Sequence, residues 1–128
     1  MDSIVFGPDL ALGIPVMDQS HRIIFDLLQS IDALPRPAFE EACHQLAEEF
    51  AQDLAEENHL MEAIGYPLAA THRAAHDSLL ASLDQACCLL AAGDESSARR
   101  MVRALPDWVE AHINTMDLAL AIAASNLK

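Results

Sequence analysis

The chain has 128 residues, which is enough for one domain with a hydrophobic core and too few for two. Its formal charge of −13 at pH 7 argues against a nucleic-acid or anionic-membrane partner, because either would require clustered Lys and Arg side chains. Apolar residues make up 52% of the chain and aromatic residues only 5%, and Ala and Leu outnumber the β-branched residues, which predicts an all-α fold.

Residues 1–17 predict an irregular N-terminal arm that lies over a helical bundle. The segment contains Gly7, Pro8, Gly13 and Pro15 among apolar residues, and these four disfavour a helix. It has no Lys or Arg and no long apolar run, so it lacks the form of a secretory signal. Charged residues or His also interrupt every candidate membrane span, and we therefore expect a soluble, cytoplasmic protein.

Two amphipathic helices are expected after the arm. The first is predicted to begin at Asp18 and to stop before Pro35. Its inward residues recur at three- and four-residue steps: His21, Ile24, Leu28 and Ile31. The second is predicted to begin near Pro37 and to end at Gly65. Its inward face comprises Leu46, Phe50, Asp53, Glu57, Leu60 and Ile64.

Two further helices complete the predicted fold. The third runs from about Ala69 to Ala92, with inward residues His72, His76, Leu79, Leu80, Leu83 and Leu90. The fourth follows Gly93 and is capped by Asp94 or Ser96. Its inward residues are Met101, Leu105, Trp108, His112, Met116 and Leu120. Short connections make neighbouring helices antiparallel, which predicts an up-down-up-down four-helix bundle over residues 18–124 and a single domain over residues 1–128.

The cysteines indicate a reducing environment. Cys43, Cys87 and Cys88 are odd in number, and their spacing fits neither a disulfide framework nor a zinc knuckle. We expect reduced thiols that pack as small apolar residues.

Each inward stripe also contains titratable residues, which suggests a buried cation. Burying such groups unpaired costs roughly several kcal/mol each, so a shared metal ion is the most economical reason to gather them. Two pairs spaced by four residues, Asp53 with Glu57 and His72 with His76, can each offer two ligands from one helix face. A single inward His is more often a hydrogen-bonded core residue than a metal ligand. Here, however, each of four successive helices carries inward titratable residues, and this favours a metal site.

The fourth helix poses a geometric question. His112 and Asp117 are five residues apart, which places them about 140° apart around a regular α-helix. Both can reach one cluster if the helix widens locally into a π-type turn, or if Asp117 bridges towards a second ion. Imidazole and carboxylate ligands without thiolate favour iron, manganese or zinc, and iron in particular where carboxylates bridge two ions in a helix bundle.

In order and interval, these residues resemble the bacterial hemerythrins of the HHE-type cation-binding family, four-helix proteins that bind dioxygen at a non-haem di-iron centre. The likeness covers nearly the whole chain. The residues that carry it are Gly13-Ile14, Asp18-Gln19-Ser20-His21, Glu57, Leu60-Met61-Glu62, Gly65-Tyr66-Pro67, His72, His76, Trp108, His112-Ile113 and Asp117.

The resemblance implies two non-haem iron ions joined by an oxo or hydroxo bridge. It implies that one iron is held by His72, His76 and His112, that Glu57 and Asp117 bridge both irons, and that His21 holds the second iron. The family has a further histidine where this chain has Asp53, and an aromatic residue where it has Leu54. His59 and His44 are expected to be exposed and outside the ligand set.

Asp53 leaves several outcomes open. If it coordinates the second iron, its negative charge favours ferric iron and shifts the site towards an oxidase, a peroxidase or a readily autoxidised form. If it is too short to reach, the second iron is weakly held or replaced. It could instead bond a metal-bound water, or mark a site no longer used. Because unpaired carboxylates are rarely buried, we expect direct or water-mediated coordination.

The resemblance also implies an apolar pocket for dioxygen beside the second iron. Its lining would comprise Ile24, Leu54, Trp108, Val109 and Ile113. Ordinary packing in a hydrophobic core is the simpler interpretation of these five residues taken alone.

The resulting prediction is a di-iron protein that binds dioxygen for storage, delivery or sensing, and is more a non-enzymatic metalloprotein than an enzyme. The alternatives are a di-iron oxidase or peroxidase, which acts on dioxygen or peroxide, and an iron store or metal-stabilised interaction module. No nucleic-acid or membrane partner is expected, and a monomer is favoured.

Overall fold

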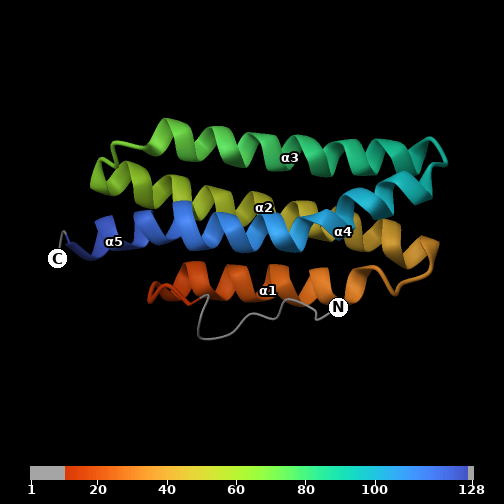
Figure 1. The fold of residues 1–128 in the computed structure, drawn as a ribbon, viewed down its shortest axis with the longest axis horizontal. Helices are drawn as coiled ribbons and strands as arrows, with labels where there is room; N and C mark the ends of the chain where they lie inside the picture. The colour runs from red at the N-terminus through yellow and green to blue at the C-terminus, as the bar shows by residue number, and fades with distance from the viewer. Residues whose placement is uncertain (1–10, 127–128) are drawn as a thin grey trace.

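Four helical rods, each antiparallel to the next, make up residues 11–126, the part of the chain that the computed structural model describes (Figure 1). The rods comprise α1 (Pro15–Ile31), α2 (Arg36–Ile64), α3 (Ala69–Ala91) and a fourth composed of α4 (Glu95–His112), the π-helical segment η2 (Ile113–Asp117) and α5 (Leu118–Asn126). Each rod packs against its neighbour in sequence, and α1 also contacts α4. The predicted all-α, up-down-up-down bundle is confirmed.

The first helix begins earlier than predicted. It starts at Pro15 rather than at Asp18, because proline needs no hydrogen-bond partner for its nitrogen in the first turn. Asp18 lies inside that turn, where its carboxylate accepts hydrogen bonds from the backbone N–H groups of Leu12 (2.8 Å) and Gly13 (3.1 Å). Asp18 therefore fixes the chain that leads into α1 instead of capping the helix.

The boundaries of the predicted bundle change accordingly. Residues 15–17, which were assigned to the arm, belong to α1, and the fourth rod continues beyond residue 124 to Asn126. Of the remaining arm, residues 11–14 precede α1 without helical structure, and residues 1–10 lie outside the described residues.

Two helix boundaries agree with their sequence signals. Gly65 ends α2 in a left-handed conformation with φ 63°, which glycine adopts without strain. Asp94 precedes α4, and its side chain accepts a hydrogen bond from the backbone N–H of Ser97 at 3.1 Å. The helices that carry the candidate ligands are thereby fixed in register.

The core between the rods is apolar except where a group of buried His, Asp and Glu side chains meets. Its largest fully buried apolar side chains include Ile24, Phe25, Ile31, Phe39, Leu46 and Leu90. Of the cysteines, Cys43 is buried in this core, whereas Cys87 is half-buried and Cys88 is exposed. The expectation that all three pack inside is therefore wrong for Cys88.

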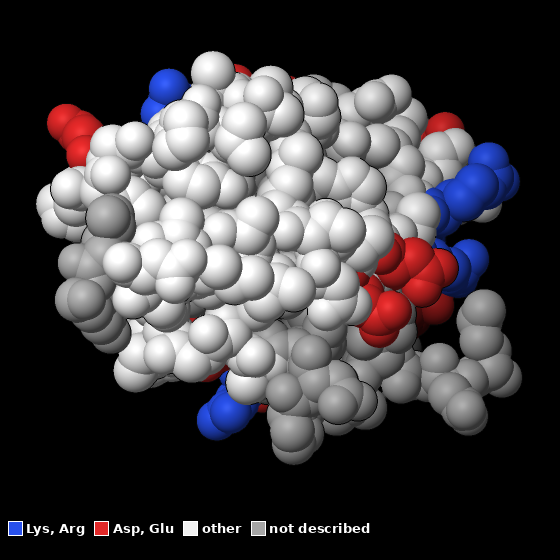
Figure 2. Space-filling view, turned by 60° about the vertical axis from the view of Figure 1, so that its left-hand side comes forward, with Lys and Arg blue, Asp and Glu red and all other residues white. Residues whose placement is uncertain are grey.

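Charge is distributed unevenly over the surface. Figure 2 shows a broad face at the end of the bundle that carries α5, where charged side chains are sparse and lie towards the margins. Exposed apolar side chains at this end include Leu68, Leu118 and Ile122. Even so, none of the helices within residues 11–126 is long and apolar enough to cross a membrane.

Candidate metal centre

Seven titratable side chains from all four rods converge in the interior of the bundle. They are His21 from α1, Asp53 and Glu57 from α2, His72 and His76 from α3, His112 from the end of α4 and Asp117 from η2. Six of them are between 0 and 4% exposed, and the His112 side chain is 9% exposed. Groups that are this deeply buried require partners, which here can only be one another or bound cations.

The π-helical segment explains how the fourth rod contributes two members. A regular α-helix would turn His112 and Asp117 well away from each other, since they are five residues apart. In the structure the helix widens to the π form over Ile113–Asp117, and His112 Nε2 lies 3.0 Å from Asp117 Oδ1. The π-type turn, one of the two arrangements that the spacing left open, is present, and it brings both side chains into the cluster.

One side of the cluster is formed by three imidazoles facing two carboxylate oxygens. Glu57 Oε1 lies 2.8 Å from His72 Nε2 and 3.2 Å from His76 Nε2. Asp117 Oδ1 lies 3.1 Å from His72 Nε2 and 3.0 Å from His112 Nε2. This side combines imidazole and carboxylate, a ligand set that suits iron, manganese or zinc.

The opposite oxygens of the same carboxylates face His21. Its Nε2 atom lies 3.4 Å from Glu57 Oε2 and 3.1 Å from Asp117 Oδ2. Asp53 Oδ1 lies 3.6 Å from the same nitrogen and completes this side. Glu57 and Asp117 therefore each present one oxygen to either side, which is the arrangement that two adjacent, carboxylate-bridged ions require.

Two of the histidines, His21 and His72, have pKa values that these carboxylates raise. Burial by itself lowers the pKa of His21, but the nearby carboxylates of Asp117, Asp53 and Glu57 outweigh burial and raise that pKa to about 12. For His72, bonds with Asp117 and Glu57 likewise overcome burial and raise the pKa to about 9. The centre thus stabilises positive charge next to its carboxylates.

The carboxylates do not behave alike. Burial opposes ionisation of Glu57, yet its bonds with His21 and His72 hold its pKa well below the usual value. Asp117 is held low by His112 and His21 in the same way. For Asp53, burial outweighs the attraction of nearby His21, the neighbouring Glu57 carboxylate acts in the same direction as burial, and the pKa is raised to about 8. Of the three carboxylates, Asp53 therefore receives the least help from protein partners in offsetting the cost of burying its ionised form.

Unpartnered buried atoms indicate that the cluster fits bound cations. Neither Asp53 Oδ1 nor Asp117 Oδ1 has an aligned hydrogen bond, although both atoms are buried. His76 Nε2 and His112 Nε2 lie 3.2 Å apart and cannot both donate to each other. Lone pairs that face one another in a buried site are satisfied by a cation lying between them. The residues present therefore suit a binuclear metal site.

A small cavity of about 10 Å³ adjoins the centre, and five of the candidate ligands line it: His21, Asp53, His76, His112 and Asp117. All five residues that were assigned to the oxygen pocket lie on its wall: Ile24, Leu54, Trp108, Val109 and Ile113. Phe50 and Leu79 also line it and were not assigned to it. Their spacing was the available signal, because each lies three residues from a candidate ligand, Asp53 or His76, on the same helix face.

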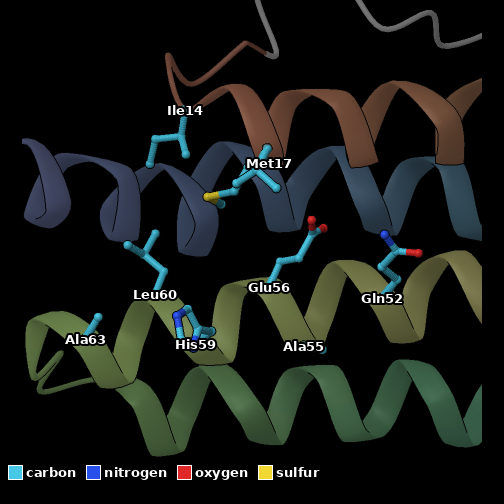
Figure 3. A pocket seen from close by; sticks show the side chains of 9 residues that line it. Ile14, Met17, Gln52, Ala55, Glu56, His59, Leu60 and Ala63 are labelled. Carbon is cyan, nitrogen blue, oxygen red and sulfur yellow. The ribbon is translucent and has the colours of Figure 1, made fainter.

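Two histidines lie outside the cluster, as predicted. His59 is exposed, and Figure 3 shows it among the residues that line a separate groove between α1 and α2. His44 is also exposed, and its Nδ1 atom lies 3.8 Å from Cys87 Sγ.

Comparison with known proteins agrees with the geometry. The sequence matches the family described as the hemerythrin HHE cation binding domain over residues 12–121. A bacteriohemerythrin of Ralstonia nicotianae is 32% identical over 117 residues, which cover 91% of this chain and 85% of the relative. One from Stenotrophomonas maltophilia is 30% identical, covering 94% and 81%. The crystal structure of a hemerythrin point mutant superposes with a TM-score of 0.82 at 23% identity, covering 89% of this chain and 90% of that one, and supports the fold.

Proposed function

This chain belongs to the hemerythrin family, and we propose that it binds dioxygen reversibly at a pair of non-haem iron ions. The observation that carries the proposal is the bridging arrangement of Glu57 and Asp117, whose paired oxygens face His72 on one side and His21 on the other. A single ion would use only one face of these carboxylates. Reversible binding suits storage, delivery or sensing of dioxygen rather than chemical turnover.

The ligands divide between the two ions by proximity. On this proposal, one iron is held by His72, His76 and His112, the second by His21 and Asp53, and both by Glu57 and Asp117. When bound, the iron pair supplies the electrons that make dioxygen binding possible. The remaining contribution of the chain is to position these ligands and to control what else reaches them.

The apolar cavity wall supports binding without turnover. Ile24 and Ile113 are fully buried beside the centre, and Trp108 stacks on the His112 ring with centroids 4.9 Å apart and an interplanar angle of 10°. A wall of this kind excludes water and the protons it carries, which slows irreversible oxidation of a metal site. The stacked indole also packs against the ring of one candidate ligand.

Asp53 is proposed as a ligand of the second iron. Its carboxylate is 4% exposed, lies on the His21 side of the cluster and keeps one oxygen without a hydrogen bond. An imidazole at this position would be neutral, so Asp53 lowers the net charge of the centre by one. The added negative charge favours ferric over ferrous iron and lowers the reduction potential.

That charge supports a second candidate function. A centre that loses electrons readily to dioxygen could act as a di-iron oxidase or peroxidase, with autoxidation as part of its cycle. The two functions differ in a measurable way. A dioxygen binder takes up and releases the gas without net consumption, whereas an oxidase or peroxidase consumes dioxygen or peroxide continuously in the presence of a reductant.

The Asp53→His variant tests the proposed function directly. If Asp53 tunes a dioxygen-binding centre, histidine at this position should slow autoxidation and leave reversible uptake intact. If wild-type protein loaded with iron shows no dioxygen-dependent change in its absorption spectrum, and the variant shows none either, the proposed function is wrong.

A further inference from the structure

A groove on the outside of the bundle approaches the metal centre between α3 and α4. It has a volume of about 290 Å³ and is lined by residues that include Ser78, Leu79, Ser82, Met101, Ala104 and Trp108. Ser78 and Ala104 are exposed and Ser82 is half-buried, so the groove is open to solvent. None of the residues that line it is a candidate ligand.

Leu79 and Trp108 line both this groove and the inner cavity. They are the two side chains that both linings share, so they lie between the groove and the inner cavity. Leu79 is 4% exposed, whereas Trp108 is half-buried and reaches the surface.

The remaining apolar wall of the cavity is closed. The other apolar lining residues are Ile24, Phe50, Leu54, Val109 and Ile113, with exposures between 0 and 5%. Apart from Leu54, these side chains belong to the main core, where packing density is close to that of an organic crystal. A route through them would require several packed side chains to move together, whereas a route past Trp108 requires one or two to change rotamer.

We propose that Leu79 and Trp108 form the gate through which a small uncharged molecule passes from the α3–α4 groove to the metal centre. The inference rests on the proposed function, which supplies dioxygen as the molecule that uses the gate. Apolar side chains on both faces of the gate favour an uncharged molecule, because an ion would have to shed its hydration shell to pass. Side-chain rotation alone opens such a barrier, without displacement of α3 or α4.

Ser82→Phe tests the gate from the outside. The phenyl ring fills the groove next to Leu79 without touching the ligand set, and should slow dioxygen association and dissociation by about fivefold each. The affinity should change by less than about twofold, because a gate alters the barrier and leaves the bound state as it was. Stopped-flow mixing and flash photolysis of the iron-loaded protein measure the two rates.

Ala63→Phe provides the matched control. Ala63 is exposed and lines the larger groove between α1 and α2, which shares no lining residue with the inner cavity (Figure 3). This substitution should leave both rates unchanged. The proposal is overturned if Ser82→Phe leaves the rates at their wild-type values, or if both substitutions slow them equally.

A second measurement does not depend on dioxygen binding at the metal. Trp108 is the single tryptophan of the chain, so its fluorescence reports directly on access to the gate. In zinc-loaded protein, which does not react with dioxygen, Ser82→Phe should reduce quenching of Trp108 by dissolved oxygen and Leu79→Ala should increase it. Unchanged quenching in both variants contradicts the gate even if the proposed function holds, and changed quenching supports it even if the iron protein binds no dioxygen.

Discussion

The carboxylates of Glu57 and Asp117 lie between His72 on one side and His21 on the other, and each directs one oxygen to either side. Glu57 comes from the long helix α2, and Asp117 comes from the π-helical end of the fourth rod. Glu57 Oε1 lies 2.8 Å from His72 Nε2, and Asp117 Oδ2 lies 3.1 Å from His21 Nε2. Two side chains that share this arrangement define two adjoining metal positions rather than one.

Replacing one bridging oxygen should therefore remove one ion. In Glu57→Gln the amide offers a single oxygen acceptor, and its NH₂ group points a donor at the other side. We expect the metal content to fall from about two ions per chain to about one. Glu62→Gln, an exposed position on the same helix, is the control and should keep the wild-type content. Elemental analysis that gives equal contents for the two variants would contradict the bridging role.

Substitutions of Asp53 should show whether its carboxylate binds the second metal ion or only fills space in the core. Asp53→Ala should weaken the second ion and lower metal content, whereas Asp53→His should keep both ions and slow autoxidation by about tenfold. Glu48→His, an exposed position on α2, is the control for adding a histidine to that helix. Autoxidation followed by optical absorption gives the rates. Equal rates in wild type and Asp53→His would mean that Asp53 has no influence on the iron.

Removing the metal should lower thermal stability. The cluster places seven buried titratable groups together, and without cations several of their lone pairs face one another. Metal at about 100 times its Kd stabilises the native state by about 2.7 kcal/mol, which corresponds to roughly 10 °C in Tm for a domain of this size. Melting curves by circular dichroism, with and without chelator, measure the shift. Identical curves would show that the cluster binds no metal under those conditions.

An ion pair far from the centre should make a small contribution that disappears in acid. Arg103 donates a hydrogen bond from Nε to Asp32 at 2.8 Å, and this bond holds the pKa of Asp32 below its usual value. The contribution of this pair to stability is complete above the ordinary carboxyl pKa of about 3.9, and it is lost as the pH falls through the lowered value. Asp32→Asn should therefore be slightly less stable than wild type at pH 7, because exposed pairs contribute little.

The pH dependence of stability tests whether Asp32 acts through its charge. The difference in unfolding free energy between wild type and Asp32→Asn, measured by urea denaturation, should shrink as the pH is lowered below about 4. A difference that persists unchanged in acid would show that Asp32 acts through packing or its backbone contacts rather than its charge.

Much of this architecture could be predicted from the sequence, because the helices carry clear periodic patterns and stop signals. Gly65 and Asp94 end and begin helices where their residue types favour those conformations. Asp18 was misjudged as the start of α1, because an acidic residue is equally favourable within the first turn. Only the structure reveals that its carboxylate bonds the preceding backbone.

The sequence predicted which residues form the centre, but not how their side chains are arranged. The five-residue interval between His112 and Asp117 left open a π-type turn or a bridging position for Asp117, and the structure combines the π-type turn with a carboxylate that faces both sides. The division of the Glu57 and Asp117 oxygens between two sides depends on side-chain orientation, which spacing does not determine. The position of Leu79 between groove and cavity depends on how α3 and α4 pack, which the pattern of one helix cannot reveal.

The central claim is that this chain holds two iron ions and binds dioxygen at them reversibly. The most direct test is the iron content per chain of protein loaded anaerobically, combined with its absorption spectrum through repeated cycles of dioxygen and argon. We predict about two irons per chain and a band that appears with dioxygen and disappears under argon. One iron or none, or a spectrum that changes once and never returns, would contradict the claim.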